Sequence, residues 1–347
     1  MESYPKGVKE MVDRPVRVAS IGMGWWSDVL ADAARKTPKI EIVKCYTRSA
    51  EKRETFAKKY NCRAASNYEE ILQDPSIEGV LITTPNNAHL ETARSAAQAG
   101  KHIFVDKPIA NTISHGRAIT EACQKAGVIL SVGYQRRRES HFRWMYRAVK
   151  EGKFGGMVQA EANISRDRVG VMDPSSWRHN PLELPGGVML QIGIHYIDIL
   201  LYLLGPVKSV SAMTSHLYLE GDNPDIAALL IEHESGALSK LSASYSTVAE
   251  LYLFNVYGRD MTAFYSFHEG LRCLHRGAKT LETVPCDKNP TIVEEIEEFA
   301  DSIRGKAKPE VGGGAALESL AVIRAGVLSA REGRHVTIKE ILASERE

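Results

Sequence analysis

Two side chains in the sequence have the chemistry to move a proton, although they lie far apart along the chain. Lys107 follows the strand-like run His-Ile-Phe-Val-Asp and precedes a proline, and His195 follows a glycine pair that opens a helical pattern. An imidazole titrates near neutral pH, and a lysine side chain hydrogen-bonds or deprotonates a hydroxyl. Taken alone, Lys107 could be a surface lysine and His195 a structural histidine with its hydrogen bonds satisfied. The elements around each residue therefore decide between a structural and a catalytic role.

The helical pattern around His195 carries further polar side chains. Gln191, His195 and Asp198 recur at spacings of four and three, which places them near one face of a helix. We therefore expect His195, on this face, to be the partner of Lys107 in proton transfer.

The first part of the chain alternates strand and helix patterns, and this alternation is typical of βαβ units with a parallel sheet. Strands are expected within residues 16–22, 40–47, 79–85, 102–108 and 128–134, and helices within 27–37, 49–60, 89–100 and 115–127.

After about residue 134 the pattern changes to successive strands, and only residues 195–205 look helical among them. Strands are expected within residues 157–167, 207–219, 226–234, 237–246, 251–260 and 261–268, followed by helices within 292–305 and 316–333. We therefore expect an α/β protein: a doubly wound parallel Rossmann domain over residues 1–133, then an α+β substrate and oligomerisation domain with a mixed or antiparallel sheet over 134–347.

The first strand ends in a glycine turn that suits a dinucleotide. Gly22 permits a tight turn, and Gly24 allows the backbone to approach a pyrophosphate at a helix N-terminus. Ser27 replaces the third glycine of the usual pattern, so a plain strand-to-helix turn is the alternative. Trp25 and Trp26 are expected to flank the cofactor or to pack in the core.

The end of the second strand bears on which cofactor binds. No acid stands where a carboxylate would bind the ribose of NAD; the residues there are Thr47, Arg48 and Ser49. A guanidinium and two hydroxyls suit a 2′-phosphate, so the sequence favours NADP over NAD. An ordinary solvated arginine is the alternative.

If a nicotinamide cofactor binds this domain, Lys107 is expected to act in catalysis. It lies at the carboxyl end of a strand, where ligands of doubly wound sheets bind, and Pro108 holds the backbone there away from helix. A neighbouring nicotinamide cation is expected to lower the lysine pKa.

Cations near the second-domain helix indicate the kind of substrate. Trp177 and three arginines, Arg166, Arg168 and Arg178, stand shortly before it. Indole stacks on a ring and guanidinium pairs with carboxylate or phosphate, although loop salt bridges explain the same arginines.

Charge and composition exclude several classes of protein. The formal net charge is +1, from 44 basic and 43 acidic residues, so we expect no nucleic-acid or membrane partner. The five cysteines form no CxxC pair, which predicts neither disulfides nor a metal site. No secretion signal is seen at the N-terminus and no window approaches a membrane span, so a cytoplasmic protein is expected.

Several segments resemble the glucose-fructose oxidoreductase, inositol dehydrogenase and rhizopine catabolism (Gfo/Idh/MocA) family. The segments are 83–108, with Asp106-Lys107-Pro108 in place of Glu-Lys-Pro, and 132–137, 177–198 and 328–338. The resemblance implies a nicotinamide cofactor, a carbohydrate-like substrate, catalytic residues at Lys107 and His195, and a dimer or tetramer. It also implies further cofactor contacts, at Thr84, Pro85, Asn86, His89, Asp106 and Arg136.

One departure from the family pattern affects the proposed chemistry. Gln191 stands where the family usually has an aspartate, so hydrogen bonding is kept and a charge is lost. The predicted activity is hydride transfer to or from a sugar, sugar acid or polyol. A carboxylated cyclic dihydrodiol as substrate, a redox-assisted glycosidase and a ligand sensor without turnover are the alternatives.

Overall fold

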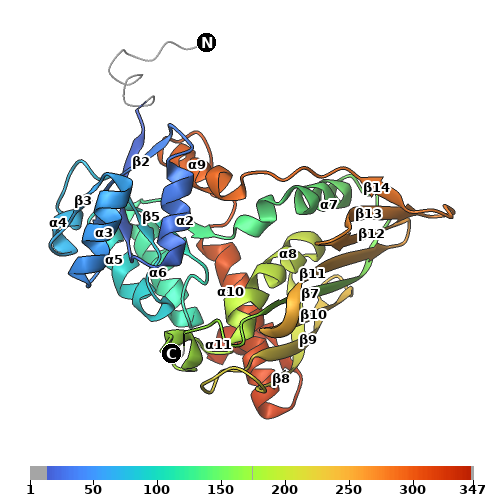
Figure 1. Ribbon diagram of the computed structural model, residues 1–347. Helices are drawn as coiled ribbons and strands as arrows, with labels where there is room; N and C mark the ends of the chain where they lie inside the picture. Colours follow the sequence, from blue (N-terminus) through green and yellow to red (C-terminus); the bar gives the residue numbers. More distant parts are fainter. Residues whose placement is uncertain (1–13, 174, 345–347) are drawn as a thin grey trace, which may run out of the picture. The chain divides into compact units, whose positions relative to one another are not determined.

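The computed structural model describes residues 14–173 and 175–344, so the N-terminal segment in which no secretion signal was seen lies largely outside the described residues. Contacts divide the chain into two compact units. Unit 1 comprises Met1–Ile109, His115–Gly133 and Pro290–Gly314, and unit 2 comprises Ala110–Ser114, Tyr134–Asn289 and Ala315–Glu347. Figure 1 shows the helices and strands that make up each unit.

Unit 1 is built on a six-stranded sheet in the order β3-β2-β1-β4-β5-β6, and all its pairings are parallel. The strands are β1 (Val16–Ile21), β2 (Ile40–Tyr46), β3 (Arg63–Ala64), β4 (Gly79–Ile82), β5 (His102–Asp106) and β6 (Leu130–Gly133). The strand order reverses between β1 and β4, and dinucleotides bind doubly wound sheets at this switch point. The predicted Rossmann architecture is confirmed.

Helices pack on this sheet, and all but the short α4 were predicted by the alternating sequence pattern. They are α2 (Trp25–Ala34), α3 (Ala50–Tyr60), α4 (Glu69–Leu72), α5 (His89–Gln98) and α6 (Ile113–Ala126), with a short 3₁₀ turn η1 (Asn86–Ala88) before α5. Ser49 caps α3 by accepting a hydrogen bond from the Lys52 amide at 3.3 Å, and Asn61 ends it in the left-handed conformation.

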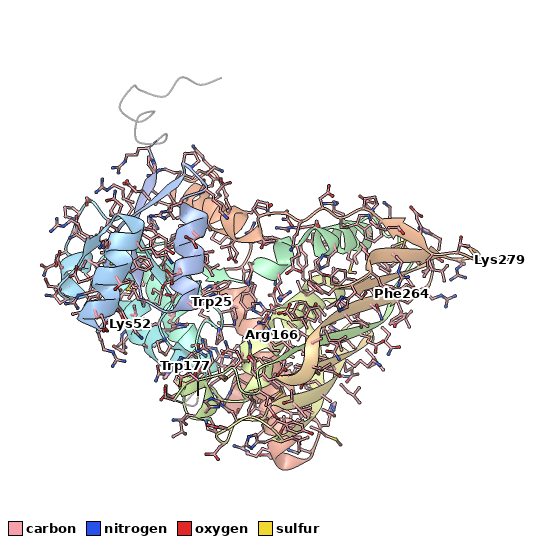
Figure 2. The ribbon with its side chains drawn as sticks, viewed as in Figure 1. Trp25, Lys52, Arg166, Trp177, Phe264 and Lys279 are labelled. Atoms are coloured by element: carbon pink, nitrogen blue, oxygen red, sulfur yellow. The ribbon has the colours of Figure 1, made fainter. Side chains whose placement is uncertain are left out.

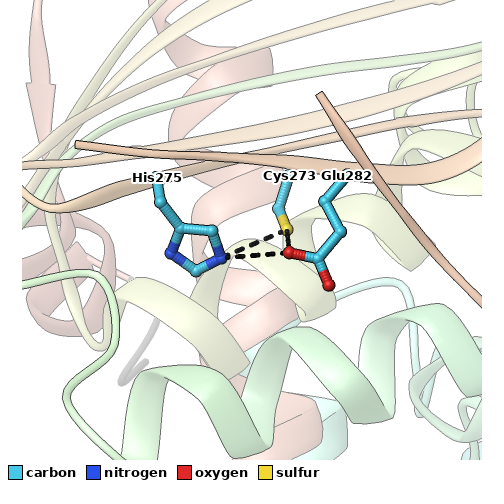
Figure 3. A group of neighbouring side chains, drawn as sticks. All are labelled: Cys273, His275 and Glu282. Carbon is cyan, nitrogen blue, oxygen red and sulfur yellow. Dashed lines mark hydrogen bonds and ion pairs between the residues drawn. The ribbon is translucent and has the colours of Figure 1, made fainter. Parts of the chain in front are cut away.

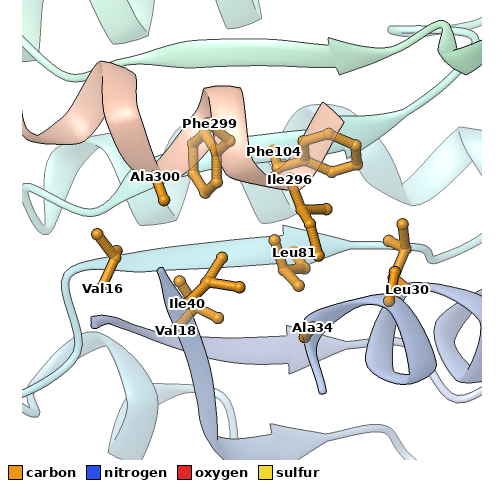
Figure 4. Close-up of a cluster of buried hydrophobic side chains, with 11 residues drawn as sticks. Val16, Val18, Leu30, Ala34, Ile40, Leu81, Phe104, Ile296, Phe299 and Ala300 are labelled. Atoms are coloured by element: carbon orange, nitrogen blue, oxygen red, sulfur yellow. The ribbon is translucent and has the colours of Figure 1, made fainter. Parts of the chain in front are cut away.

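One helix reaches unit 1 from the far end of the sequence. α9 (Thr291–Ile303) packs on the sheet with Ile296, Phe299 and Ala300 fully buried (Figure 4). The ring of Phe299 meets that of Phe104 on β5 edge to face, with centroids 5.8 Å apart. A division of the chain at one point does not capture this return, because local sequence patterns carry no information on which core a distant helix joins.

Unit 2 is built on a nine-stranded mixed sheet in the order β14-β13-β12-β11-β7-β10-β9-β8-β15, in which β7 and β10 are parallel and the other pairs antiparallel. The strands are β7 (Met157–Asp167), β8 (Val207–Ser215), β9 (Ile226–His233), β10 (Leu238–Ser244), β11 (Ser246–Gly258), β12 (Met261–Ser266), β13 (Gly270–His275), β14 (Glu282–Val284) and β15 (Val336–Thr337). The predicted mixed sheet is confirmed, and β13 to β15 extend it.

The helices of unit 2 include two that the sequence pattern did not predict, α7 (Ser140–Lys150) and α11 (Ile338–Ser344). In α7 the buried positions recur with helical spacing, but arginines and a lysine between them obscure the apolar pattern. The other helical segments are η2 (Gln135–Arg138), η3 (Trp177–His179), η4 (Met189–Gly193), α8 (Ile194–Leu204) and α10 (Gly313–Glu332).

Helix α10 corrects one expectation from composition. It is 20 residues long with a mean hydropathy of 1.2 in its most apolar window, so it is long and apolar enough to cross a membrane. More than half of that window, 56%, is buried inside the protein, and a buried core helix meets the same criteria. The statement that no window approaches a membrane span was therefore wrong for this helix.

Candidate functional site

The turn after β1 is held by a backbone approach that only glycine permits. Gly22 has φ of +93°, and a Cβ added there would lie 2.8 Å from the backbone nitrogen of Thr84. The Thr83 amide donates to the Ile21 carbonyl at 2.8 Å, and the Thr83 hydroxyl donates to that of Gly22 at 2.8 Å. Two hydrogen bonds and close backbone packing thus hold the carboxyl ends of β1 and β4 together at the switch point.

Gly24, at the N-cap of α2, has a different environment. Its backbone is extended, with φ of −109°, and a Cβ added there would meet no atom within 4 Å. No protein atom therefore requires a glycine, whereas a phosphate lying against the backbone would. Ser27 replaces the third glycine and donates from its hydroxyl to the Gly24 carbonyl at 2.6 Å, which stabilises the first turn.

The two tryptophans after Gly24 have different surroundings. Trp25 is 74% exposed at the start of α2 (Figure 2), and Trp26 packs against the core cluster of unit 1. Trp26 therefore has the core packing that was one of the two expectations, and a cofactor contact of the exposed Trp25 stays a prediction.

The segment after β2 presents cations and hydroxyls. Arg48 is exposed, and Arg53, which donates to the Thr47 carbonyl at 3.2 Å, adds a second guanidinium. The Ser49 hydroxyl already accepts from the backbone as the cap of α3, so its remaining capacity is to donate.

Beyond β4, the predicted cofactor residues Asn86 and His89 are buried, and Thr84 and Pro85 are partly buried. The Thr84 hydroxyl is buried without a hydrogen-bond partner among the described residues, Pro85 precedes η1, and Asn86 is 7% exposed. His89 is 1% exposed, and its ring lies between backbone carbonyls.

The His89 ring connects the end of β4 to the loop that carries Lys107. Its Nδ1 lies 3.0 Å from the Pro108 carbonyl oxygen, and its Nε2 lies 3.0 Å from the Thr84 carbonyl oxygen. Burial lowers the pKa of His89 below its ordinary value, and the nearby Lys107 charge acts in the same direction. The ring therefore lies between the two loops, and because a neutral imidazole has one N–H, it donates to one of these carbonyls.

Lys107 lies at the carboxyl end of β5, as expected. The peptide bond between Lys107 and Pro108 is cis, and Lys107 is 9% exposed. Asp106 ends β5 opposite Gly133, where a Cβ would lie 3.4 Å from the carboxylate oxygen Oδ1. This carboxylate thus lies next to the lysine in sequence and close to the end of β6.

In unit 2, His195 begins a helix that is preceded by an irregular turn. Met189–Gly193 forms a π-helix that contains Gln191 and leads into α8, where His195 is 7% exposed. π-Helical turns are frequent at functional sites, because the extra residue changes the direction of side chains on the helix. The ring of Tyr134 meets that of His195 edge to face at 6.4 Å.

Asp198, on the same helix, is committed to a buried ion pair. Arg137 donates to its two carboxylate oxygens at 2.6 and 2.7 Å, and Ser319 on α10 adds a contact at 3.3 Å. Asp198 is 1% exposed, so it holds α8 in place rather than offering a carboxylate to a ligand. Sequence reasoning missed Arg137 because the pair joins residues 61 apart.

Arg136, the neighbour of Arg137, lies among tyrosine rings. Its guanidinium donates to Glu139 at 3.0 Å and lies 4.8 Å from the centroid of Tyr252. Burial lowers the pKa of Arg136, but Glu139 and the neighbouring tyrosines Tyr196, Tyr252 and Tyr265 together raise it above its ordinary value, so the guanidinium is held cationic. The Nε of Arg136 is buried without a partner among the described residues.

The predicted substrate residues of unit 2 gather around two tyrosines. Arg166, labelled in Figure 2, donates to the Tyr252 hydroxyl at 2.7 Å. Its guanidinium lies 5.7 Å from the centroid of the same ring. Burial raises the pKa of Tyr245, while the charges of Arg166, Arg178 and Arg168 act against this rise. The structure therefore brings all three arginines within electrostatic range of one phenol.

Trp177 and Arg178 form a stacked pair in η3. The Arg178 guanidinium lies 4.6 Å from the centroid of the Trp177 ring, as in a cation–π contact (Figure 2). Arg178 and Tyr245 also line a small cavity of about 10 Å³ with Asn223, whose side chain donates to the Arg178 carbonyl at 2.7 Å. The cavity is no larger than a water, so it is a packing defect and not a substrate pocket.

Unit 1 meets the requirements of a nicotinamide dinucleotide on its own geometry. The switch point, the open space at Gly24 and the unpartnered Thr84 hydroxyl lie at the carboxyl ends of neighbouring strands. The N-terminus of α2 has no side-chain cap, so its amides suit a pyrophosphate.

Two family models cover most of the chain. Residues 16–134 match the model described as the oxidoreductase family, NAD-binding Rossmann fold, and residues 142–263 match the GFO/IDH/MocA C-terminal domain. The chain therefore belongs to the GFO/IDH/MocA family, as the sequence motifs predicted, and it is an NAD(P)-dependent oxidoreductase.

Individual relatives match this chain over most of its length. A solved structure assigned as an NADPH-dependent oxidoreductase of Desulfitobacterium hafniense is 34% identical, with a TM-score of 0.89, and the match covers 95% of this chain and 99% of that one. Two Bacillus subtilis proteins are named scyllo-inositol 2-dehydrogenase. The NADP(+) form is 26% identical over 78% of this chain and 82% of its own, and the NAD(+) form is 29% identical over 78% and 80%.

The open space at Gly24 leads to a prediction about cofactor binding. Gly24→Ser should keep the melting temperature or raise it slightly, since serine is a good N-cap and a Cβ meets nothing there. The affinity for NAD(P)H should fall about 10-fold or more, as expected when a charged hydrogen bond is blocked. Fluorescence titration of NAD(P)H measures this loss.

Gly314→Ser is the matched control, because a Cβ at Gly314 also meets nothing within 4 Å. This variant should change neither the melting temperature nor the affinity. Unchanged cofactor affinity in Gly24→Ser would contradict a phosphate site at this turn.

Proposed function

We propose that this oxidoreductase transfers a hydride between a nicotinamide cofactor and the C–OH carbon of a sugar, sugar acid or other polyol. The observation that carries the proposal is the position of Lys107, at the carboxyl end of a strand in the same sheet as the glycine turn. The inositol dehydrogenases among the relatives support a polyol as the substrate class.

The bound nicotinamide supplies the hydride acceptor or donor. Oxidation of an alcohol also releases the hydroxyl proton, which requires a base near that oxygen. We assign this proton transfer to Lys107 and His195, whose side chains are the two groups with suitable chemistry. The buried His89 ring lies against the Pro108 carbonyl, so the backbone next to Lys107 is held in place.

Gln191 modifies this chemistry. An amide donates and accepts hydrogen bonds but does not hold a charge, so it orients a hydroxyl without raising the pKa of a nearby imidazole. We therefore assign the larger part of the proton transfer to Lys107.

The arginines of unit 2 favour an anionic form of the substrate. Arg136 and Arg166 both lie against the Tyr252 ring, and both have a buried Nε without a partner among the described residues. Guanidinium groups pair with carboxylate or phosphate in this setting. A sugar acid fits this group, and so does the second candidate, a carboxylated cyclic cis-dihydrodiol with Trp177 stacked on its ring.

The cofactor we propose is NADP. Arg48 is exposed after β2 with Arg53 nearby, and the positions after β2 hold no acid that would bind a ribose 2′-hydroxyl. The relatives named above include both an NADP(+) and an NAD(+) enzyme, so the choice rests on these side chains.

We further propose a cytoplasmic homo-oligomer. The sheet face that carries Met213, Leu230 and Leu238 exposes these side chains by 81, 65 and 56%. Exposed apolar groups gathered on one sheet face are typical of a subunit contact.

Lys107 provides the central test of the mechanism. Lys107→Ala should lower kcat by about 10²–10⁴-fold with nearly unchanged cofactor affinity, the usual contribution of a positioned acid or base. Lys107→Arg keeps the charge but does not release a proton, so it should lose a similar factor. Steady-state kinetics with a cofactor titration separate the two quantities.

His195→Ala should lower kcat as well, and the double variant should lose less than the product of the two factors, because groups that act together are not additive. Lys125→Ala, an exposed lysine on α6, is the control and should behave as the wild type. Wild-type turnover in Lys107→Ala would remove the proposed mechanism.

Arg48 tests the choice of cofactor. Arg48→Ala should weaken NADP binding far more than NAD binding, by about 1.5–3 kcal/mol, the range for a hydrogen bond to a charged group. Isothermal titration with both cofactors gives the two affinities. Equal losses for NADP and NAD would contradict a 2′-phosphate contact at Arg48.

Arg178 tests the anionic substrate. A panel of sugars, sugar acids, inositols and carboxylated dihydrodiols, read by nicotinamide absorbance, identifies the substrate class. Arg178→Ala should then raise KM chiefly for the carboxylated members, whereas Arg94→Ala, an exposed arginine paired with Glu91, should not. An equal rise in KM for neutral sugars would argue against the anion site, and cleavage without net cofactor reduction would identify a glycosidase.

A further inference from the structure

Three potential metal ligands meet at the edge hairpin of the unit 2 sheet. Cys273 and His275 lie two residues apart on β13, so their side chains share a face, and Glu282 on β14 is the direct partner of Cys273 in the antiparallel ladder (Figure 3). Backbone register therefore brings the three side chains together.

The spacing of the three ligand atoms suits one small ion. Cys273 Sγ lies 3.6 Å from His275 Nε2 and 4.0 Å from the Glu282 carboxylate oxygen, and His275 Nε2 lies 3.6 Å from that oxygen. Tetrahedral zinc, with Zn–S about 2.3 Å and Zn–N and Zn–O about 2.0–2.1 Å, sets its ligand atoms roughly 3.3–3.6 Å apart. A movement of a few tenths of an ångström by the exposed Glu282 side chain completes the geometry.

The surroundings favour a bound cation. Leu271 and Val284 on the same face are buried, and so is Cys273 itself, whereas His275 and Glu282 are exposed. The ligand group thus lies where the apolar face of the sheet opens to solvent, which leaves a path for the ion and for a water. The nearby Arg276 is paired with Asp260 at 2.8 Å, so its charge is compensated.

We propose that Cys273, His275 and Glu282 bind a zinc-class divalent ion, with water in the fourth position. Thiolate and imidazole select zinc over the hard ions calcium and magnesium, which take oxygen ligands. β14 is a three-residue edge strand, and the loop that carries Lys279 joins it to β13 (Figure 2). A metal bridge between the two strands fastens this edge of the sheet.

The proposal is independent of the oxidoreductase chemistry, and its test measures metal directly. Full-length protein freed of metal with a chelator is titrated with Co²⁺ and then Zn²⁺. We expect one equivalent of Co²⁺ per chain, a thiolate-to-cobalt charge-transfer band with tetrahedral d–d bands, and displacement by Zn²⁺.

Variants locate the ion on the hairpin. His275→Gln and Glu282→Gln change exposed side chains, and each should weaken Zn²⁺ binding by at least ~10-fold, since even loss of a group behind a metal ligand costs that much. Cys273→Ser should abolish the charge-transfer band. His268→Gln and Cys286→Ser are matched controls near the hairpin and should bind as the wild type.

Hydrogen exchange gives a second readout. Added Zn²⁺ should slow amide exchange within residues 270–284 in the wild type and not in Glu282→Gln. Absence of stoichiometric binding, binding unchanged in the three ligand variants, or unchanged exchange in the hairpin would each overturn the proposal.

Discussion

The buried ion pair between Arg137 and Asp198 is the interaction on which the candidate site of unit 2 depends. Both side chains are nearly inaccessible to solvent, and the guanidinium spans both carboxylate oxygens. Loss of one partner from such a pair costs about 3–5 kcal/mol, because the other charge stays buried. Asp198 lies about one helical turn after His195, so the pair holds the first turns of α8 in place. It also holds η2, the 3₁₀ segment that carries Arg136.

Other contacts extend this constraint through the helices. Tyr202 on α8 accepts a hydrogen bond from Arg143 at 2.9 Å and stacks on Tyr146, with ring centroids 3.9 Å apart, so α7 is joined to the C-terminal part of α8. Ser319 brings α10 to the same carboxylate. The π-helical turn before His195 thus leads into a helix that has little freedom to move, and a reacting side chain on it keeps its orientation.

Unit 1 uses close backbone packing for the same purpose. The approach of Gly22 to Thr84 leaves no space for a side chain, and the buried His89 ring lies between the Thr84 and Pro108 carbonyls and donates to one of them. The glycine turn, the end of β4 and the Lys107 loop are therefore parts of one connected arrangement. It makes the carboxyl edge of the sheet rigid where the cofactor is expected.

The sequence by itself determined the class of fold and the principal chemical groups. Alternating apolar runs and the glycines at 22 and 24 predict a Rossmann sheet, and the position of Lys107 after a strand follows from local pattern, since the apolar run and the proline after it are visible in consecutive residues. Only the tertiary structure decided the commitments of Asp198 and His89, the return of α9 to unit 1 and the meeting of Cys273 with Glu282. Each of these depends on a partner distant in sequence or on strand register, and side-chain spacing along one element does not specify either.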